Sequence, residues 1–472
     1  NILSFEEQYP GARVIRLEQN YRSTQAILDA ANAVISHNVG RKGKKLWTAR
    51  QGGSPILVYE ANDESAEGNF VAGQILAGSH GKDFKDYAIL YRTNAQSNAM
   101  EYALKRNGIP YKVIGGTRFF DRAEVKDMLS YLCVINNRSD DLRLGRIINN
   151  PPRGLGAKSI ETVQRLAETE GKSLYSVISD PYSYASLEKN APKLLQFSAL
   201  IEGLAQLLAD GMSLPEFYDE LLIRTGYADM LSAKPTEENR TRLENVRELK
   251  SSIHAYMANT DMPTLAGFLE EIALYTDLEQ YSPGDDAVVM MTVHSAKGLE
   301  FPHVFLVGFE DGLFPGMRAI GDQEEMEEER RLCYVAITRA KQTLTISHAH
   351  QRMIYGRTSA SQASRFLREI PESCIVKRGG YHATEERRRE PYEKRITRTS
   401  GYLASTARAA SAPSAPLPDY NKGDTVMHAA FGKGLVLSVV KMGGDALLEV
   451  AFDDIGTKKL MAKTASAHMK KL

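Results

Sequence analysis

Apolar runs separated by polar segments predict short strands and helices in the first 115 residues. Four short apolar runs are typical of strands: residues 13–17, Ile56–Tyr59, Tyr87–Tyr91 and Tyr111–Ile114. Helices are predicted over Tyr21–Ile35, where apolar residues recur at helical spacing, and over Asn98–Asn107. Strands that alternate with helices in this way indicate an α/β layer built on a parallel sheet.

The middle of the chain has a different pattern. From Glu124 to about Gln280 the segments read mostly as helices, with few β-branched runs. Strands return at Ala287–Thr292, Val304–Val307 and Leu344–Ser347. The simplest interpretation is an all-helical domain inserted into one α/β domain.

The last hundred residues divide into a linker and a small β unit. Residues 373–418 are charged at first and then rich in Ala, Ser and Pro, a composition typical of a flexible linker. Short strands follow around Val426 and at residues 434–440, 447–452 and 458–461, with a turn at Gly443–Asp445. A unit of this size and pattern predicts a small SH3-like or Tudor-like barrel.

Composition narrows the class of protein only moderately. The 472 residues are 43% hydrophobic and 25% charged, which is ordinary for a soluble protein. The absence of a long apolar run and of a signal pattern in residues 1–20 favours the cytoplasm and no membrane partner. The three cysteines show no CxxC spacing, which argues against structural zinc, iron–sulfur clusters and a disulfide framework. A net charge of zero argues against a DNA-coating protein, but it allows a locally basic groove.

The apolar spacing around Arg339 predicts a buried guanidinium. Leu332, Val335, Ala336 and Arg339 fall at i, i+3, i+4 and i+7 of a predicted helix, so the arginine shares its inward stripe. An unpaired buried charge is very costly, and the arginine therefore needs an anion. A salt bridge to Glu300 would satisfy it without any ligand.

A second candidate anion site lies at Asn20–Ser23, before the first predicted helix. The amino terminus of a helix offers free N–H groups and a positive dipole end, and Arg22 suits bidentate contact with phosphate. The alternative is that Ser23 simply caps the helix while Arg22 lies in solvent. A third candidate is Thr292–Glu300, where a predicted strand gives way to a loop, a common place for functional residues.

Three extended strings together resemble the ATP-side motifs of the C-terminal portion of UvrD/PcrA-type superfamily-one DNA helicases. They are LEQNYRST at residues 17–24, TVHSAKGLEF at 292–301 and YVAITRA at 334–340. The resemblance covers nearly all of residues 1–372 and, more loosely, 420–472. It implies an α/β fold: a RecA-like parallel sheet domain with an inserted all-helical domain, plus a small C-terminal SH3/Tudor-like β-barrel.

The resemblance also implies domain boundaries. Residues 1–20 would end a first RecA-like motor domain, and residues 21–115 with 284–372 would form the second. Residues 116–283 would be the inserted helical domain, 373–418 the linker and 419–472 the barrel. The barrel resembles the Tudor-like module of the PcrA branch, which implies contact with RNA polymerase.

Roles for individual residues follow from the same resemblance. On the ATP side, Arg339 would reach the γ-phosphate as an arginine finger, and Arg22 would contact the same phosphate. Tyr21 would lie near the base, and Glu300 would contact the ribose or nucleotide. Thr292 and His294 would link this site to single-stranded DNA. The turn containing Gly154 and Gly156 would contact duplex DNA through backbone N–H groups, or would be only a helix–helix turn.

The ATP site implied in this way is incomplete. No Gly-x-x-x-x-Gly-Lys-Ser/Thr phosphate loop occurs anywhere in the sequence. Glu310 and Asp311 follow a predicted strand but lie beyond its end, so we interpret them as loop residues and not as magnesium ligands. The phosphate loop and the ligands for Mg²⁺ are expected from a missing N-terminal domain. The chain, which begins at Asn1, is therefore expected to be a fragment that hydrolyses almost no ATP alone.

The resulting functional hypothesis is an ATP-dependent 3′–5′ DNA helicase or translocase, acting on single-stranded and forked DNA in repair or replication. The alternative is a non-catalytic DNA-binding or RNA-polymerase-tethering module that keeps helicase architecture. A helicase–nuclease subunit is disfavoured because the tail of about 50 residues is too short for a nuclease domain.

Overall fold

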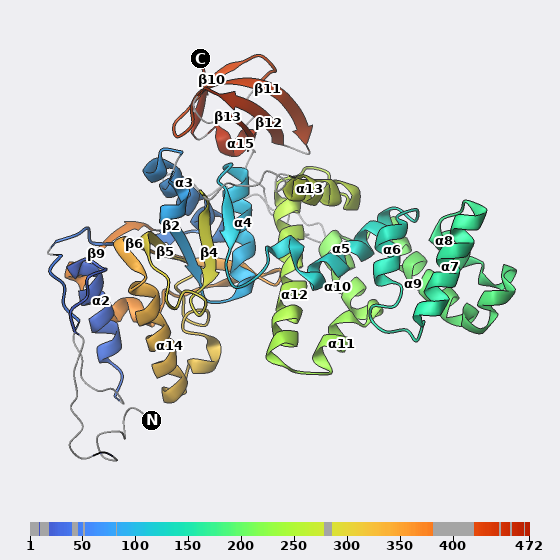
Figure 1. Ribbon diagram of the computed structural model, residues 1–472, viewed down its shortest axis with the longest axis horizontal. Helices are drawn as coiled ribbons and strands as arrows, with labels where there is room; N and C mark the ends of the chain where they lie inside the picture. The colour runs from blue at the N-terminus through green and yellow to red at the C-terminus, as the bar shows by residue number, and fades with distance from the viewer. Residues whose placement is uncertain are drawn as a thin grey trace, which may run out of the picture.

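The computed structural model describes residues 9, 18–39, 46–50, 52–81, 83–277, 286–380, 420–442, 445–453, 456–466 and 468–472. The strand predicted at residues 13–17 and the turn glycines 443 and 444 lie outside these ranges. The described residues form three regions: a parallel sheet with flanking helices, a helical region, and a small antiparallel unit at the C-terminal end (Figure 1).

The sheet region is built on seven parallel strands in the order β3-β4-β2-β5-β6-β1-β9. The strands are β1 Ile56–Ala61, β2 Tyr87–Tyr91, β3 Tyr111–Val113, β4 Val288–Thr292, β5 Phe301–Leu306, β6 Ala340–Ala349 and β9 Ile375–Gly379. Every residue of β2 is buried, as expected for a central parallel strand covered on both faces. The predicted α/β class is therefore confirmed.

Helices α2 (Gln25–Ser36), α3 (Glu64–Ser79), α4 (Ser97–Arg106) and α14 (Gln323–Ile337) belong to this region. Helix α3 escapes prediction because its inward face includes a fully buried polar residue, Glu67, and because glycines such as Gly68 are weak helix formers. Its start is nevertheless well defined, since the Asp63 side chain accepts a hydrogen bond from the Ala66 N–H.

Three predicted boundaries are corrected. Helix α2 begins at Gln25 and not at Tyr21, because the Asn20 side chain accepts the N–H groups of Arg22 and Ser23 and holds a turn there. Helix α14 ends at Ile337, so Arg339 lies just beyond it and not on its stripe. Strand β9 pairs with β1 along residues 375–379, so the linker predicted from residue 373 starts too early.

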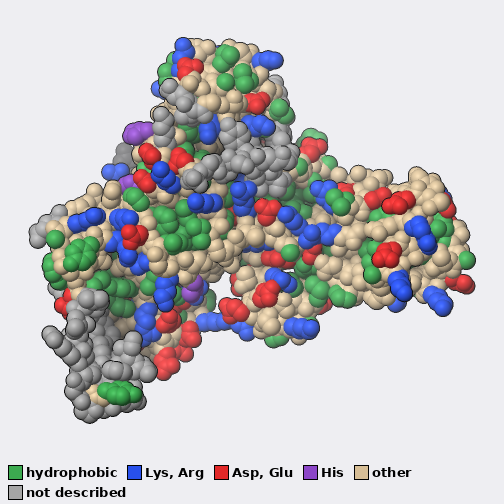
Figure 2. Space-filling view, in the orientation of Figure 1, with side chains coloured by type: hydrophobic (Ala, Val, Ile, Leu, Met, Phe, Trp, Pro, Cys, Tyr) green, Lys and Arg blue, Asp and Glu red, His purple; other side chains and the backbone are tan. Residues whose placement is uncertain are grey.

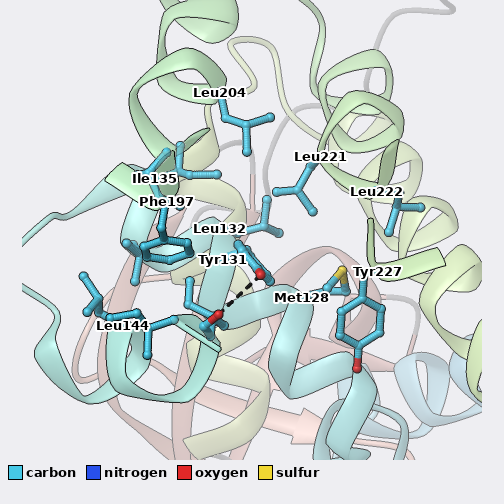
Figure 3. Packing of buried hydrophobic residues seen from close by; sticks show 14 of the residues in the cluster. Met128, Tyr131, Leu132, Ile135, Leu144, Phe197, Leu204, Leu221, Leu222 and Tyr227 are labelled. Carbon is cyan, nitrogen blue, oxygen red and sulfur yellow. Dashed lines mark hydrogen bonds between the residues drawn. The ribbon is translucent and has the colours of Figure 1, made fainter. Parts of the chain in front are cut away.

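The helical region holds nine helices within the described residues: α5 Ala123–Asn136, α6 Asp141–Ile147, α7 Ala157–Glu170, α8 Leu174–Ser179, α9 Ala191–Ala209, α10 Leu214–Thr225, α11 Tyr227–Ser232, α12 Glu237–Ala258 and α13 Leu265–Asp277. They share one apolar core, in which Met128 and Leu132 of α5 pack with Phe197 of α9 and Leu221 of α10 (Figure 3). None of the helices in the described ranges combines the length and the apolar character needed to cross a membrane.

A hairpin joins the sheet region to the helical region. Strands β7 (Gln351–Ile354) and β8 (Arg357–Ala360) project toward α12, and their turn donates two backbone N–H groups to it. The Tyr355 N–H lies 3.0 Å from a carboxylate oxygen of Glu248, and the Gly356 N–H lies 3.0 Å from Oγ of Ser251. Burial raises the pKa of Glu248 to about 7.

The C-terminal unit is a five-stranded antiparallel sheet in the order β13-β12-β11-β10-β14. Its elements are β10 Thr425–His428, β11 Gly432–Met442, β12 Asp445–Phe452, β13 Gly456–Met461, the short helix α15 Ala462–Ala465, and β14 Met469–Lys471. This unit, the barrel, shares an apolar cluster with α3 and α4 of the sheet region. Contact is close at Gly108, where a Cβ atom would lie 2.6 Å from Leu460.

An ion pair fixes the barrel on α4, and its loss is expected to loosen the contact. Arg106 donates to Asp445 at 2.8 Å, with both side chains largely buried. Arg106→Met would leave the carboxylate without its cation, and we expect a loss of about 2 kcal/mol from this contact. Hydrogen exchange should accelerate in both α4 and β12. Lys471→Met, which breaks the more exposed pair with Asp424, should leave α4 unchanged; equal effects of both variants would contradict the assignment.

Candidate functional site

The first site lies where β5 and β6 begin. The Phe301 N–H donates to the Arg339 carbonyl at 3.0 Å, which aligns the amino ends of the two strands. The fully buried Ser23 hydroxyl donates to the Ala340 carbonyl at 2.7 Å and docks the segment before α2 at the same place. The sequence-predicted residues Arg22, Glu300 and Arg339 are thereby brought together from distant parts of the chain.

Glu300 pairs with two cations at this site. Its carboxylate accepts a hydrogen bond from Nε of Arg22 and lies 2.8 Å from Nζ of Lys341. The hydrogen bond from Lys341 and, after it, the one from Arg22 lower the pKa of Glu300 despite some desolvation. The alternative of a Glu300–Arg339 salt bridge is not observed, because Glu300 pairs with Arg22 and Lys341 instead. Lys341 was not identified from the sequence, although its place just after Arg339 at the start of β6 was a usable signal.

Arg339 is half-buried and is held by uncharged oxygens. Its guanidinium donates to the carbonyls of Val335 and Leu299 at 3.0 and 2.9 Å and to the Thr338 hydroxyl at 3.2 Å. Burial lowers the pKa of Arg339, and the neighbouring charge of Arg22 lowers it further. Arg22 and Arg339, called the arginine pair below, both lie at the amino ends of β5 and β6, and guanidinium forks favour an anion with several oxygens, such as a polyphosphate.

Tyr21, the other residue predicted to lie on the nucleotide side, presents its ring to solvent. Its side chain is 73% exposed, and its hydroxyl donates to Oε1 of Gln19 at 2.6 Å. An exposed aromatic ring beside an arginine pair fits a nucleotide, which carries a flat base and phosphates. In the part of the chain that the structure describes, no group of three or more His, Cys, Asp or Glu residues could hold a metal ion. These residues fit the nucleotide, but they provide no ligand set for magnesium.

The second site is a cleft of about 1300 Å³ between α12 and the carboxyl ends of β2 and β4. Thr292 and His294 line it together with Arg92, Arg240 and Arg318. Basic and acidic side chains both gather on the face between the sheet region and the helical region (Figure 2). Burial and the charge of Arg92 lower the pKa of His294, so this imidazole is neutral near pH 7.

Arg92 and Glu329 organise the wall of this cleft, and sequence reasoning missed both. Arg92 donates to Oε2 of Glu329 through Nε at 3.2 Å and to Oε1 through Nη2 at 2.7 Å, a bidentate pair. Glu329 also accepts the Gly316 N–H at 3.2 Å. The available signal was the position of Arg92 directly after the buried strand β2, where functional residues of α/β folds often lie.

The segment between Thr292 and Phe301 connects the two sites. Strand β4 ends at Thr292 and strand β5 begins at Phe301, and both run parallel to the intervening strand β2. Residues 293–300 must therefore pass from the carboxyl end of the sheet to its amino end. The segment therefore has His294 in the cleft near one end and Glu300 beside Arg22 at the other.

The remaining predicted residues lie elsewhere. Gly154 and Gly156 form the turn before α7, in the helical region and apart from both sites (Figure 1). Gly154 has a φ of +70°, and its carbonyl accepts Nζ of Lys193 at 2.6 Å. Glu310 is buried and pairs with Arg352, while Asp311 pairs with Arg365, so both carboxylates have structural partners.

Comparisons with known proteins agree with this architecture. Residues 15–351 match the family described as UvrD-like helicase C-terminal domain, and residues 423–467 match the PcrA/UvrD tudor domain. The chain belongs to the UvrD-like helicase C-terminal domain family, and its barrel is of the tudor type. The family and fold predicted from the sequence are thereby confirmed.

Individual relatives that the chain resembles include ATP-dependent DNA helicases named PcrA. The chain is 43% identical over 476 residues to the ATP-dependent DNA helicase PcrA of Staphylococcus aureus (strain Mu50 / ATCC 700699), covering 100% of this chain and 64% of the relative. It is 42% identical over 474 residues to the protein of the same name from Staphylococcus epidermidis (strain ATCC 12228 / FDA PCI 1200), covering 98% and 63%. The chain thus spans less than two thirds of the length of these relatives.

Proposed function

We propose that this chain forms one wall of the ATP site, together with part of the DNA path, of an ATP-dependent 3′–5′ DNA helicase or translocase. Its substrates would be single-stranded and forked DNA in repair or replication. The observation that carries the proposal is the segment 293–300, which joins the arginine pair to the cleft. The identity to PcrA helicases supports it. The phosphate loop and the magnesium ligands would come from residues outside this sequence, which has no Gly-x-x-x-x-Gly-Lys-Ser/Thr string.

The domain assignment is part of the proposal. Residues 21–115 and 284–372, extended by β9, would form the second RecA-like motor domain, and residues 1–20 would end the first. Residues 116–283 would be the inserted helical domain, and 419–472 the barrel. The sheet order supports this assignment, because strands from both sides of the helical region pair within one sheet.

In the proposed mechanism, ATP supplies the phosphoryl group whose transfer to water drives the motor. Arg22 and Arg339 bind the terminal phosphate and stabilise its developing charge, with Arg339 acting as the arginine finger. Glu300 orients Arg22 and contacts the sugar, and Tyr21 covers the base. When ATP binds, Glu300 moves with the nucleotide. Segment 293–300 transmits this movement to Thr292 and His294, which hold the single strand.

Two further partners belong to the proposal. The turn at Gly154 and Gly156 would contact the phosphates of duplex DNA, which the exposure of both glycines before α7 permits. The barrel would contact RNA polymerase. Partly exposed apolar side chains on β10 and β11 support a protein-binding role: Met427, Leu435, Leu437 and Val440.

The pure chain is expected to hydrolyse almost no ATP, with or without single-stranded DNA, because the arginine pair alone provides neither a phosphate cradle nor a magnesium site. Phosphate release measured at saturating ATP tests this. Robust turnover that is lost in Arg339→Ala would refute the one-wall assignment.

A non-catalytic DNA-binding or polymerase-tethering module is the second candidate, favoured by the same missing phosphate loop. The test compares the affinity of the chain alone for a single strand with its affinity after fusion to the N-terminal part of a relative, the part to which this chain does not align. Equal affinities favour this second function.

A further inference from the structure

The Glu300 carboxylate is shared between two cations, with one on each oxygen. Its Oε2 accepts a hydrogen bond from Nε of Arg22, and its Oε1 lies 2.8 Å from Nζ of Lys341. The three side chains are between 32% and 38% exposed, so solvent and a ligand can reach them. In this arrangement Arg22 holds only one of the two carboxylate oxygens.

The sheet sets the starting positions of these three side chains. Lys341 is the second residue of β6, and Glu300 directly precedes β5, whose first residue pairs with Ala340. The Ser23 hydroxyl donates to the Ala340 carbonyl at 2.7 Å and so attaches the residue after Arg22 to the same strand end. Exchange of partners among the three charges therefore needs only side-chain movement.

The outer side of the Arg22 guanidinium is open. In the part of the chain that the structure describes, this group donates to Glu300 through Nε, while Nη1 and Nη2 donate no hydrogen bond. Its backbone is held separately, because the Arg22 N–H donates to the Asn20 side chain at 2.7 Å. The two terminal nitrogens, called the fork below, can bind two oxygens of one phosphate, a contact for which arginine is better suited than lysine.

A carboxylate next to an arginine commonly forms two parallel N–H···O bonds, because this bidentate pair is stronger than a single bond. Glu300 would form such a pair through Nε and Nη2 of Arg22 if its Oε1 were free, and the fork would then be occupied. The Lys341 ammonium is a compact charge on a flexible stem, so it can hold Oε1 and follow small movements of the carboxylate.

Other pairs in the chain show both arrangements. Three pairs of the sheet region use Nε and Nη2 on the two carboxylate oxygens: Arg92–Glu329, Arg330–Glu369 and Arg365–Asp311. Asp127 shows the opposite case, since Arg146 donates to its Oδ1 through Nε alone and its Oδ2 accepts from two other side chains. A second donor on the other oxygen thus accompanies the single-bond pair there, as Lys341 does at Glu300.

We propose that Lys341 is a positioning residue of the nucleotide site: by holding Oε1 of Glu300, it prevents a bidentate Glu300–Arg22 pair and keeps the Arg22 fork available for the terminal phosphate. This inference rests on the proposed function, since it assumes that Arg22 binds a phosphate of ATP. In this role Lys341 contacts the carboxylate and not the ligand.

A double-mutant cycle separates this role from direct contact with phosphate. The protein is a chimera of the N-terminal part of Staphylococcus aureus PcrA, the part to which this chain does not align, with the full chain. Lys341→Met is expected to lower kcat/KM for ATP roughly tenfold, the effect of one charged hydrogen bond, and mainly through a higher KM because Glu300 competes as ATP binds. Lys341→Arg should keep most of the wild-type value. The matched control, Lys377→Met at an exposed position of β9, should change nothing.

The second half of the cycle repeats Lys341→Met in a Glu300→Gln background. The amide is neutral and competes poorly for a guanidinium, so Lys341→Met should now change kcat/KM by less than about twofold. A lysine that binds the phosphate itself would lower kcat/KM in both backgrounds, and that result would overturn the inference. An unchanged kcat/KM in the first background would overturn it as well.

Chemical modification of the chain alone gives a readout that needs no nucleotide. Phenylglyoxal condenses with the terminal nitrogens of a guanidinium, so a bidentate pair with Glu300 should protect Arg22. Modification of Arg22, followed by mass spectrometry, should slow roughly threefold or more in Lys341→Met, while that of the exposed Arg331 stays the same. Equal rates at Arg22 with and without Lys341 would overturn the inference. A wild-type chimera that hydrolyses no ATP would overturn the proposed function, and these rates would still decide whether Lys341 keeps the fork open.

Discussion

Replacing Arg339 with alanine is expected to lower ATP turnover by about 10³-fold or more once the missing wall of the site is supplied. The protein to test is a chimera in which the N-terminal part of Staphylococcus aureus PcrA, the part to which this chain does not align, is fused before Asn1. Arg339 is half-buried and is held by the carbonyls of Val335 and Leu299, so its guanidinium has a fixed orientation in the chain alone. The loss should fall on kcat, because the interaction strengthens as charge develops on the transferred phosphoryl group.

Two variants control for this effect. Arg339→Lys keeps the charge but lacks the planar fork, so it should recover little of the turnover. Arg331→Ala removes an exposed arginine of α14 that pairs with neighbours on its own helix, and turnover should stay within about twofold of the wild type. If the chimera carrying Arg339→Ala hydrolyses ATP as well as the unmodified chimera, the assignment of the arginine finger is contradicted.

Replacing Arg352 with methionine is expected to destabilise the sheet region by about 3–5 kcal/mol, as when one partner of a buried ion pair is removed. Arg352 is almost fully buried and donates to Glu310 and, at 2.6 Å, to Glu67. Its loss leaves two buried carboxylates without a cation. Urea denaturation measures the change, and Arg331→Met, at an exposed pair, should cost less than about 1 kcal/mol.

The Arg352–Glu310 pair makes the free energy of unfolding depend on pH. Burial raises the pKa of Glu310, but the hydrogen bond and charge of Arg352 outweigh it, so the pKa lies below its usual range. A lowered carboxyl pKa contributes stability above the unfolded value of about 4.3 that is lost as the pH falls through the folded value. Without Arg352 the carboxyl pKa is raised instead. The gap between wild type and Arg352→Met should therefore shrink below about pH 4; a gap that is constant from pH 7 to 3 would contradict this account.

The local pattern of apolar residues was sufficient to predict an element where all of its side chains are buried. The strand Tyr87–Tyr91 was predicted with its observed bounds because all five of its side chains are buried and apolar. Pattern failed where buried polar groups replace apolar ones. Helix α3 was missed because Glu67 lies on its inward face to pair with Arg352, a partner 285 residues away. Strand β9 was missed because its side chains beyond Ile375 are exposed at the edge of the sheet, where nothing requires an apolar run.

In the candidate site, too, the sequence identified residues but did not predict how they pair. Arg22, Glu300 and Arg339 were found because each lies in a long recognisable string, and the structure brings them together. Their actual pairing was not predictable, since the choice of Lys341 over Arg339 as the second cation on Glu300 depends on how β5 and β6 align. The Arg92–Glu329 pair likewise joins residues 237 positions apart, and no local spacing reveals it.

Coupling of the cleft to the arginine pair is tested most directly by the ATP turnover of the chimera with and without single-stranded DNA, compared with that of the chain alone. The chain alone should show almost no turnover, and turnover by the chimera should rise at least tenfold with oligo(dT). His294→Ala should abolish that stimulation but leave basal turnover unchanged. A chimera that folds and binds oligo(dT) yet shows no stimulated turnover would contradict the claim that segment 293–300 couples the cleft to the arginine pair.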